Sequence, residues 1–273
     1  MSTETPSTQP ASARTSAVGA KVLAITSGKG GVGKTFVSAN LAAALTKRGY
    51  RILVLDADLG LANLDVVLNL YPKTTLHDVF TGKAKLENAI HKAPGGFSVL
   101  LAGSGMVEYS RLTPQVRNEF LEVINTLIPK YDLLLLDTGA GISDVVLFAV
   151  SLASEVLVVA TPEPTSLTDA YATIKVLAVQ QNREHVHLIV NQTVRNGDGR
   201  AIAAQLQQVL DRYVGTEVGK HVRLQHLGDI PMDISVREAV MRRQLLMQTA
   251  AGSPAAVSIT NLAAKLDESL LGK

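Results

Sequence analysis

The sequence contains no cysteine and no tryptophan, and only 4% of its 273 residues are aromatic. The absence of cysteine excludes disulfide frameworks, cysteine nucleophiles, zinc ribbons and cysteine-held iron–sulfur clusters. The shortage of aromatic side chains argues against a platform that stacks the bases of single-stranded nucleic acid. Excess charge is also missing, since 26 Lys and Arg residues against 24 Asp and Glu residues leave a net charge of +2. Binding to nucleic acid through bulk positive charge is therefore not expected.

Long apolar runs are absent as well. No stretch reaches the ~18 apolar residues of a transmembrane helix, and the amino-terminal segment lacks the basic start and apolar centre of a secretory signal. Residues 1–20 are rich in Ser, Thr and Ala without apolar periodicity, which predicts a disordered tail. With 47% hydrophobic residues, the remainder can form a substantial core. We therefore expect a cytoplasmic protein with this tail and one folded domain over residues 21–273.

From Lys21 onward, short runs rich in β-branched and aliphatic residues alternate with helical patterns. Several of these runs show no polar alternation, as expected for strands that are buried on both faces of a parallel sheet. The alternation predicts an α/β fold with a doubly wound, mainly parallel sheet, helices on both faces and ligands at the carboxyl ends of the strands. The expected strands are Val22–Thr26, Ile52–Leu55, Leu133–Leu136, Val156–Ala160 and His187–Val190, and the expected helices are Lys34–Lys47, Gln115–Leu127, Asp144–Ala153, Ser166–Gln181 and Ala201–Tyr213.

A phosphate-binding pattern lies between the first expected strand and the first expected helix. Residues 28–35 read G-K-G-G-V-G-K-T, which fits G-x-x-x-x-G-K-[ST] in the strand–loop–helix context that this pattern requires. The glycines let backbone N–H groups converge on phosphate oxygens, and the helix dipole adds positive charge there. We expect Lys34 to reach the β- and γ-phosphates and the Thr35 hydroxyl to bind Mg²⁺. The predicted nucleotide-binding residues of this segment are Gly28, Lys29, Gly30, Gly31, Val32, Gly33, Lys34, Thr35 and Phe36.

Lys29 is an additional lysine inside this loop, and the run Lys29–Thr35 resembles the deviant Walker A motif of the MinD/ParA ATPases. In that family the first lysine crosses a nucleotide-sandwich dimer and contacts the phosphates of the partner subunit. The resemblance implies that the cofactors are ATP and Mg²⁺ and that ATP drives the formation of a homodimer. It also implies catalytic roles for Lys34 and for Lys29, the latter acting in trans in the way an arginine finger does.

Three carboxylates stand at the ends of expected strands. Asp56 and Asp58 follow one apolar run, and Asp137 follows another. A carboxylate at the tip of a buried strand suits a water-mediated contact to Mg²⁺. By resemblance, Asp56 and Asp137 join Thr35 as the metal-site residues, Asp56 in the outer shell. The resemblance also makes Asp58 the third catalytic residue, which positions or activates the attacking water.

Two further segments resemble the family's switch regions. Leu59–Asp65 is similar to switch I of the MinD branch, and Thr138–Gly141 is similar to switch II. Gly139 stands where relatives often carry Pro or Ala, so we expect a looser switch II here.

The adenine side of the site rests on resemblance alone. Leu188–Asn191 ends one expected strand and Gly228–Asp233 follows a later one, and both resemble the family's base-binding segments. The resemblance implies that Asn191 reads the adenine and that the loop with Pro231 covers it. Without the resemblance, either segment is an ordinary strand end.

Two segments indicate a particular branch of the family. Thr161–Ala172 and Asp58–Asn63 are similar to the flagellar number regulators of the FlhG/FleN branch. This resemblance implies an ATP-hydrolysing switch that regulates flagellar number or placement and flagellar gene expression. Its implied partners are a flagellar transcription activator, the flagellar signal-recognition-type GTPase or a basal-body component. On physical grounds alone, Thr165-Ser166 fits a helix start, and Thr165–Asp169 fits a capping box.

An alternative function is that of a positioning or partition ATPase that acts on membrane or on nonspecific DNA. The last helical pattern carries an apolar stripe, but its charges cancel, so we expect a helix that packs on the sheet more than one that binds membrane. Transient association with the inner membrane or the cell pole stays open as part of the flagellar resemblance. The surface arginines form only small clusters, which disfavours DNA binding. The stripe consists of Val257, Ile259, Leu262, Leu266 and Leu270, and the arginines are Arg195, Arg200 and those of Arg237–Arg243.

Overall fold

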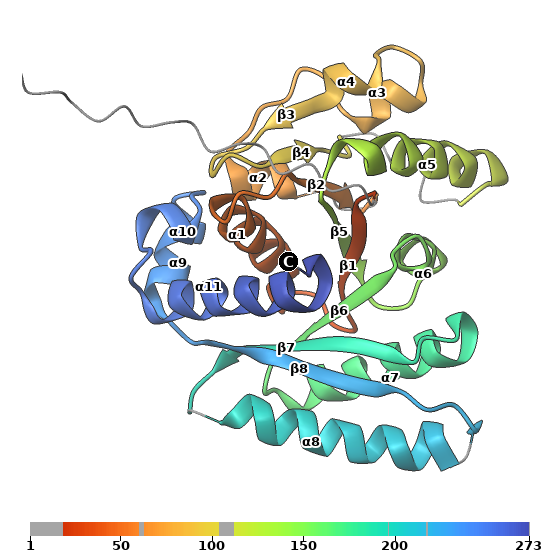
Figure 1. The fold of residues 1–273 in the computed structure, drawn as a ribbon, viewed down its shortest axis with the longest axis vertical. Coiled ribbons are helices and arrows are strands. Elements are labelled where there is room, and N and C mark those ends of the chain that lie inside the picture. The colour runs from red at the N-terminus through yellow and green to blue at the C-terminus, as the bar shows by residue number, and fades with distance from the viewer. Residues whose placement is uncertain (1–18, 60–62, 104–111, 196, 217, 273) are drawn as a thin grey trace, which may run out of the picture.

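The computed structural model describes residues 19–272 apart from 60–62, 104–111, 196 and 217. Its strands are β1 (Lys21–Ser27), β2 (Ile52–Ala57), β3 (Ile90–Lys92), β4 (Ser98–Leu100), β5 (Leu133–Ala140), β6 (Glu155–Ala160), β7 (His185–Thr193) and β8 (Arg223–Pro231). They form one sheet in the order β3-β4-β2-β5-β1-β6-β7-β8 (Figure 1). Every neighbouring pair is parallel except β3 and β4 at one edge. The predicted doubly wound, mainly parallel α/β sheet is confirmed.

Helices cover both faces of this sheet (Figure 1). One face carries α1 (Lys34–Lys47), α10 (Leu246–Thr249) and α11 (Pro254–Leu266). The other carries α5 (Pro114–Leu127), α6 (Asp144–Ser151), α7 (Pro164–Gln181) and α8 (Asp198–Leu210). The shorter elements are α2 (Leu64–Leu68), α3 (Leu76–Phe80), α4 (Leu86–Ala89), α9 (Ile234–Met241), the 3₁₀-helix η2 (Ile128–Lys130) and the π-helices η3 (Asp211–Thr216) and η4 (Asp267–Leu271).

The side chains of the central strands belong to two separate hydrophobic layers, one on each face of the sheet. In β1, Leu23 and Ile25 pack beneath α1 and α11, whereas Val22 and Ala24 pack beneath the helices of the other face. Because both faces are covered, the strand is apolar throughout, and this explains why runs without polar alternation are strands here. Three residues of the predicted apolar stripe belong to the core, since Ile259, Leu262 and Leu266 are buried, whereas Val257 is 47% exposed. This confirms the expectation that the last helix packs on the sheet.

Several boundaries differ from those that the sequence predicts. Helix α7 begins at Pro164 and not at Thr165-Ser166, because a proline at the first helical position already has helical φ and forces Glu163 before it to be extended. The predicted capping box over Thr165–Asp169 is wrong, since Glu163 is the N-cap and no side chain caps the helix. Strand β8 also reaches Pro231, so Gly228–Pro231 lies within a strand and not after it.

Two predicted segments lie partly outside the described residues. Of the predicted tail, only Gly19 and Ala20 are described, and the Ala20 backbone N–H donates to the Ile128 carbonyl at 2.9 Å. Residues 60–62 of the switch I segment are likewise outside. In the described part of the chain, no helix combines the length and the apolar character needed to cross a membrane.

Candidate functional site

The glycine-rich loop connects β1 to α1 at the carboxyl edge of the sheet, where β1 lies between β5 and β6. Gly33 is the N-cap of α1 with φ 97°, a left-handed conformation that favours glycine. A Cβ at Gly30 or Gly31 would meet no described heavy atom within 4 Å, so this side of the loop is open. The first turn of α1 leaves backbone N–H groups without intrahelical partners. The loop is therefore a site for an anion such as phosphate.

Lys34 occupies the centre of this arrangement. Its Nζ donates a hydrogen bond to Ser27 Oγ at 3.0 Å, and Ser27 Oγ in turn donates to the Lys29 carbonyl at 2.7 Å. Burial lowers the pKa of Lys34, whereas the negative charges of Asp137 and Asp58 act in the opposite direction. The amine is thus held among carboxylates at the strand ends, where it can meet a phosphate oxygen.

Two buried carboxylates lie side by side next to Lys34. Asp56 of β2 and Asp137 of β5 are register partners, with only 1% and 3% of their surface exposed. Burial, followed by the charge of Asp137, raises the pKa of Asp56 well above its ordinary value. Burial also raises the pKa of Asp137 to about 6, against hydrogen bonds from Thr35 and Ser38 and the charge of Lys34. Two such carboxylates are costly to ionise unless a cation lies nearby.

Oxygen donors from three elements converge at this point. The Ser38 hydroxyl of α1 donates to Asp137 Oδ1 at 2.8 Å, and the Thr35 hydroxyl donates to Asn63 Oδ1 at 3.1 Å. Hydroxyl and carboxylate oxygens are the ligands that Mg²⁺ prefers. The residues present therefore fit Mg²⁺, with Thr35, Asp56 and Asp137 as the set that the sequence predicts. Ser38 and Asn63 were not among the predicted site residues.

Asp58 lines a cavity in front of these groups. Its backbone N–H donates to Asp56 Oδ1 at 3.2 Å. A Cβ at Gly139 would lie 3.4 Å from the Asp58 carboxyl carbon, so Gly139 of β5 lies directly beside this carboxylate. The cavity measures about 530 Å³, and Gly30, Gly31, Lys34 and Asn63 also line it. Asp58 therefore faces the same space as the open side of the glycine-rich loop.

The predicted adenine-side residues lie at neighbouring strand ends. Asn191 of β7 is the register partner of Ile230, the residue before Pro231 in β8. The Asn191 side-chain amide donates to the Val32 carbonyl at 2.8 Å, so it braces the back of the glycine-rich loop. Phe36 lies in the first turn of α1 and its ring is buried in the core, so its contact with a nucleotide would come from its backbone and not from its ring.

Lys29 points away from the core and contacts the start of α7. Its Nζ lies 2.6 Å from Glu163 Oε2 and donates to Thr165 Oγ1 at 2.9 Å. We call this ion pair and hydrogen bond the Lys29 contact. Sequence reasoning missed Glu163 and Thr165 as site residues, although both lie in the segment that marks the flagellar branch. No local signal could have found them, since 134 residues separate Lys29 from Glu163.

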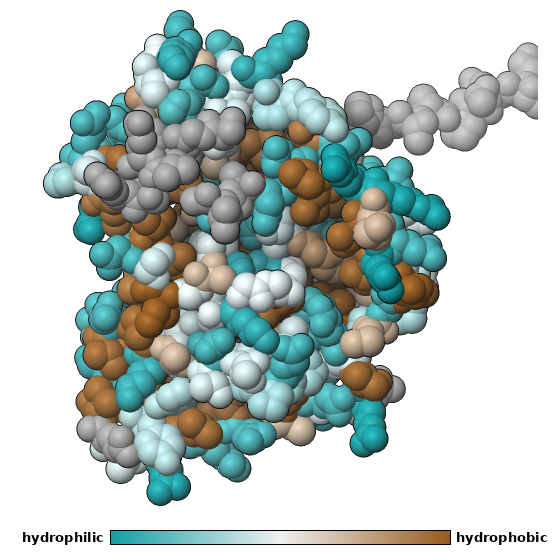
Figure 2. Space-filling view, turned by 180° about the vertical axis from the view of Figure 1, so that it is seen from behind, coloured by the Kyte–Doolittle hydropathy of each residue, from teal (hydrophilic) through white to brown (hydrophobic). Residues whose placement is uncertain are grey.

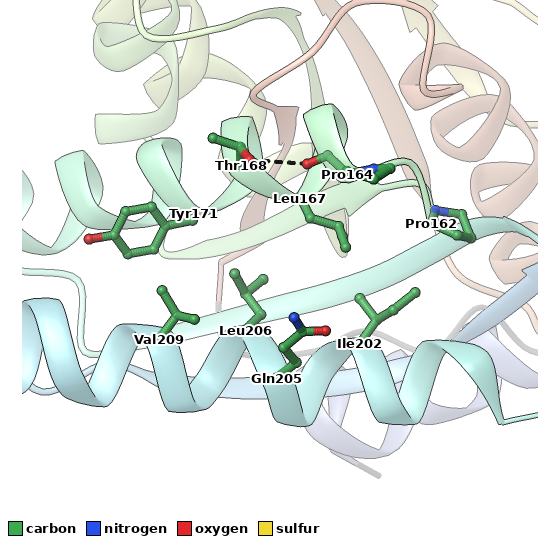
Figure 3. Close-up of a pocket in the computed structure, with 9 residues that line it drawn as sticks. All are labelled: Pro162, Pro164, Leu167, Thr168, Tyr171, Ile202, Gln205, Leu206 and Val209. Carbon is green, nitrogen blue, oxygen red and sulfur yellow. Dashed lines mark hydrogen bonds between the residues drawn. The ribbon is translucent and has the colours of Figure 1, made fainter.

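A second cavity of about 530 Å³ lies between α7 and α8, and we call it the α7–α8 cleft. Its lining is mainly apolar and comes from both helices (Figure 3). Pro162 and Pro164, which flank Glu163, form part of this lining. The cleft therefore borders the segment that contacts Lys29.

The family to which the chain belongs follows from a match over most of its length. Residues 19–267 match the family described as ParA, NUBPL iron-transfer P-loop NTPase. The chain belongs to this family. The sequence has no cysteine, so this chain cannot hold a cysteine-ligated iron–sulfur cluster.

Relatives within the family include two flagellar proteins. The antiactivator FleN of Pseudomonas aeruginosa is 41% identical over 247 residues, which are 90% of this chain and 86% of that protein. The flagellum site-determining protein YlxH of Helicobacter pylori is 33% identical over 90% of this chain and 81% of its own length. Among solved structures, the septum site-determining protein MinD of Pyrococcus horikoshii complexed with Mg-ADP has a TM-score of 0.75 and 30% identity. It covers 91% of this chain and 96% of its own length.

Proposed function

We propose that this protein is a Mg²⁺-dependent ATPase that forms a homodimer on binding ATP and regulates flagellar number or placement and flagellar gene expression. One observation carries the proposal: Lys34, Thr35, Asp56 and Asp137 meet at the open side of a glycine-rich loop that carries the additional Lys29. The resemblance of that loop to the deviant Walker A motif supports the dimer. The flagellar part rests on the relatives described as an antiactivator and as a flagellum site-determining protein.

The chain's own residues divide the chemistry of ATP hydrolysis among them. The backbone N–H groups of residues 28–36 bind the phosphates, and Lys34 neutralises charge that develops on the transferred phosphoryl group. Thr35, Asp56 and Asp137 hold the Mg²⁺ ion, which when bound neutralises phosphate charge. Asp58 orients the attacking water from the cavity that it lines. The side chain of Lys29 crosses the dimer interface and stabilises the charge on the phosphates that the partner subunit binds.

The base and the partners complete the proposal. We assign the adenine to Asn191 and Pro231, and this assignment is supported by the register of β7 and β8, in which Asn191 pairs with Ile230, the residue before Pro231. The partners we propose are proteins: a flagellar transcription activator, a flagellar signal-recognition-type GTPase or a basal-body component. We propose that the protein acts in the cytoplasm and associates only transiently with the inner membrane or the cell pole.

Surface composition supports protein partners over membrane or DNA. The apolar residues Ile259, Leu262 and Leu266 of α11 are buried, so they are not available to insert into lipid. On the face seen in Figure 2, hydrophobic patches are interspersed with hydrophilic residues. Such a mixed surface does not suit an anchor in lipid. The near balance of 26 Lys and Arg against 24 Asp and Glu residues disfavours binding to DNA through bulk charge.

The test combines turnover and assembly. Wild type should hydrolyse ATP and form a dimer with ATP in sedimentation velocity. Asp58→Ala should bind ATP but stall turnover and accumulate as dimer, and Lys34→Ala should lose nucleotide binding. Unchanged nucleotide affinity in Lys34→Ala, or normal turnover in Asp58→Ala, would contradict the assigned roles.

The flagellar role needs a separate measurement. In a strain that lacks the protein, electron microscopy should show an altered number or position of flagella per cell. A strain that carries Asp58→Ala should show a defect too, because the switch can no longer be reset. Unchanged flagellation in both strains would favour the positioning or partition function instead.

A further inference from the structure

The Lys29 contact keeps the side chain of Lys29 within its own subunit. Lys29 lies 2.6 Å from Glu163 and 2.9 Å from Thr165, with side-chain exposures of 36% for Lys29 and 62% for Glu163. The proposed function requires the same amine to reach phosphates bound by a partner subunit. One ammonium group cannot occupy both positions, so contact within the subunit competes with contact across the dimer.

The backbone around Glu163 favours the contact within the subunit. Pro162 and Pro164 flank Glu163, and each proline fixes its own φ. A residue that precedes proline is kept out of the helical region, and Glu163 accordingly has φ −62° and ψ 132°. Both prolines line the α7–α8 cleft on the side of α7 (Figure 3). Little chain entropy is therefore lost when Glu163 meets Lys29.

The electrostatics of α7 make Glu163 necessary for this position of Lys29. Glu163 is the N-cap of an 18-residue helix, yet its side chain makes no capping hydrogen bond and instead pairs with Lys29. The amino end of a helix carries partial positive charge, which repels a lysine. Without the Glu163 carboxylate, Lys29 would face that positive end unpaired and would move into solvent.

We propose that the Lys29 contact is an autoinhibitory contact that opposes ATP-driven dimerisation. Each of the two subunits must break its own Lys29 contact before both lysines can cross the interface. The factor by which one contact weakens dimerisation therefore enters the dimerisation constant as its square. An exposed ion pair shifts an equilibrium by about 1.4- to 5-fold, which makes the effect on the dimer constant about 2- to 30-fold. This inference rests on the proposed function, since it assumes that Lys29 acts across the dimer.

Glu163→Gln is the first test, because glutamine keeps the size of the side chain and removes its charge. In sedimentation velocity with Mg²⁺ and a non-hydrolysable ATP analogue, the variant should dimerise about 2- to 30-fold more tightly than wild type. Glu87→Gln is the matched control. Glu87 pairs with Lys130 at 3.1 Å, and its side chain is 62% exposed, as is that of Glu163. Lys130 lies in η2, directly before β5 begins, so this pair is at the amino ends of the parallel strands and away from the glycine-rich loop at their carboxyl ends. The control should match wild type.

A second measurement tests the contact without a dimer. In the nucleotide-free protein, the rate at which a mild acylating reagent modifies Lys29, followed by mass spectrometry, should rise by about 1.4- to 5-fold in Glu163→Gln. Thr165→Val removes only the hydrogen bond from the Lys29 ammonium to an uncharged hydroxyl and leaves the ion pair with Glu163, so it should shift both measurements in the same direction by a smaller factor.

Each outcome decides between the possibilities. If wild type dimerises and Glu163→Gln dimerises equally or more weakly, autoinhibition is refuted and Glu163 acts inside the dimer or not at all. An unchanged acylation rate of Lys29 refutes the contact itself. If neither protein dimerises while Lys29 reacts faster in the variant, the contact stands and the dimeric part of the proposed function fails.

Discussion

Replacing Gly28 by alanine tests how closely the glycine-rich loop approaches α7. A Cβ at Gly28 would lie 2.1 Å from the carbonyl oxygen of Asp169 and 2.2 Å from its carbonyl carbon, both in the backbone of α7. Real Cβ atoms essentially never approach below 3.0 Å. Since backbone cannot rotate away as a side chain can, the loop or the helix must move by roughly 1 Å.

The expected loss follows from the cost of forcing extra atoms into packed structure. Such overpacking costs about 1–3 kcal/mol, and for a domain of this size each kcal/mol lowers the melting temperature by about 2–4 °C. Gly28→Ala should therefore lower the melting temperature by about 2–12 °C. Gly30→Ala is the control in the same loop, because a Cβ there meets nothing within 4 Å of it.

Thermal unfolding of both variants without nucleotide, followed by circular dichroism, provides the assay. The two substitutions change the unfolded chain in the same way, so the difference between them isolates the contact with Asp169. Gly30→Ala should stay within about 0.5 kcal/mol of wild type. Equal stabilities of the two variants would refute the close approach of loop and helix.

Three further predictions concern buried groups. Leu262→Ala should lower the free energy of unfolding in urea by about 2–5 kcal/mol, because Leu262 is only 2% exposed. Burial lowers the pKa of His187 below 6.5, so the unfolded chain takes up the proton first and stability falls as the pH drops below 6.5. The melting temperature of His187→Gln should therefore fall less on acidification than that of wild type. Ser38→Ala removes a donor to Asp137 and should weaken nucleotide binding roughly tenfold or more with Mg²⁺ present but little in EDTA, measured by calorimetry.

Strong local signals account for what the sequence predicts well. The helix Lys34–Lys47 has the predicted bounds, since a phosphate-loop motif precedes it and apolar residues fill it. Strand β5 begins with four leucines before Asp137, and such a run leaves little alternative to a buried strand, although the strand continues to Ala140. The short elements between Leu64 and Leu100 were not predicted. Strand β3 has only three residues and, among the described strands, pairs with β4 alone. It therefore depends on the existing edge of the sheet and is too short to show an apolar period of its own.

The parts of the site that sequence reasoning missed depend on distant partners. Ser38 meets Asp137 across 99 residues, and Lys29 meets Glu163 across 134 residues. Spacing within a motif cannot reveal such pairs, because the register of the sheet and the packing of α7 bring them together. Glu163 was expected only as part of a branch-specific segment. Glu163 is the N-cap of α7, because the helix begins at Pro164, one residue before the predicted start at Thr165.

The contacts that α10 and η4 make with α1 have a consequence for how the chain is made. The Met247 backbone N–H donates to Asn40 Oδ1 of α1 from 207 residues further along the chain, and Asp267 pairs with Arg48. Ribosomes add about 5–20 residues per second. The phosphate-loop helix therefore waits on the order of 10–40 s before the segment that covers its apolar face is synthesised. During this interval the nascent chain exposes that face, so we expect the loop to become competent for nucleotide only after Met247 and Asp267 have been synthesised.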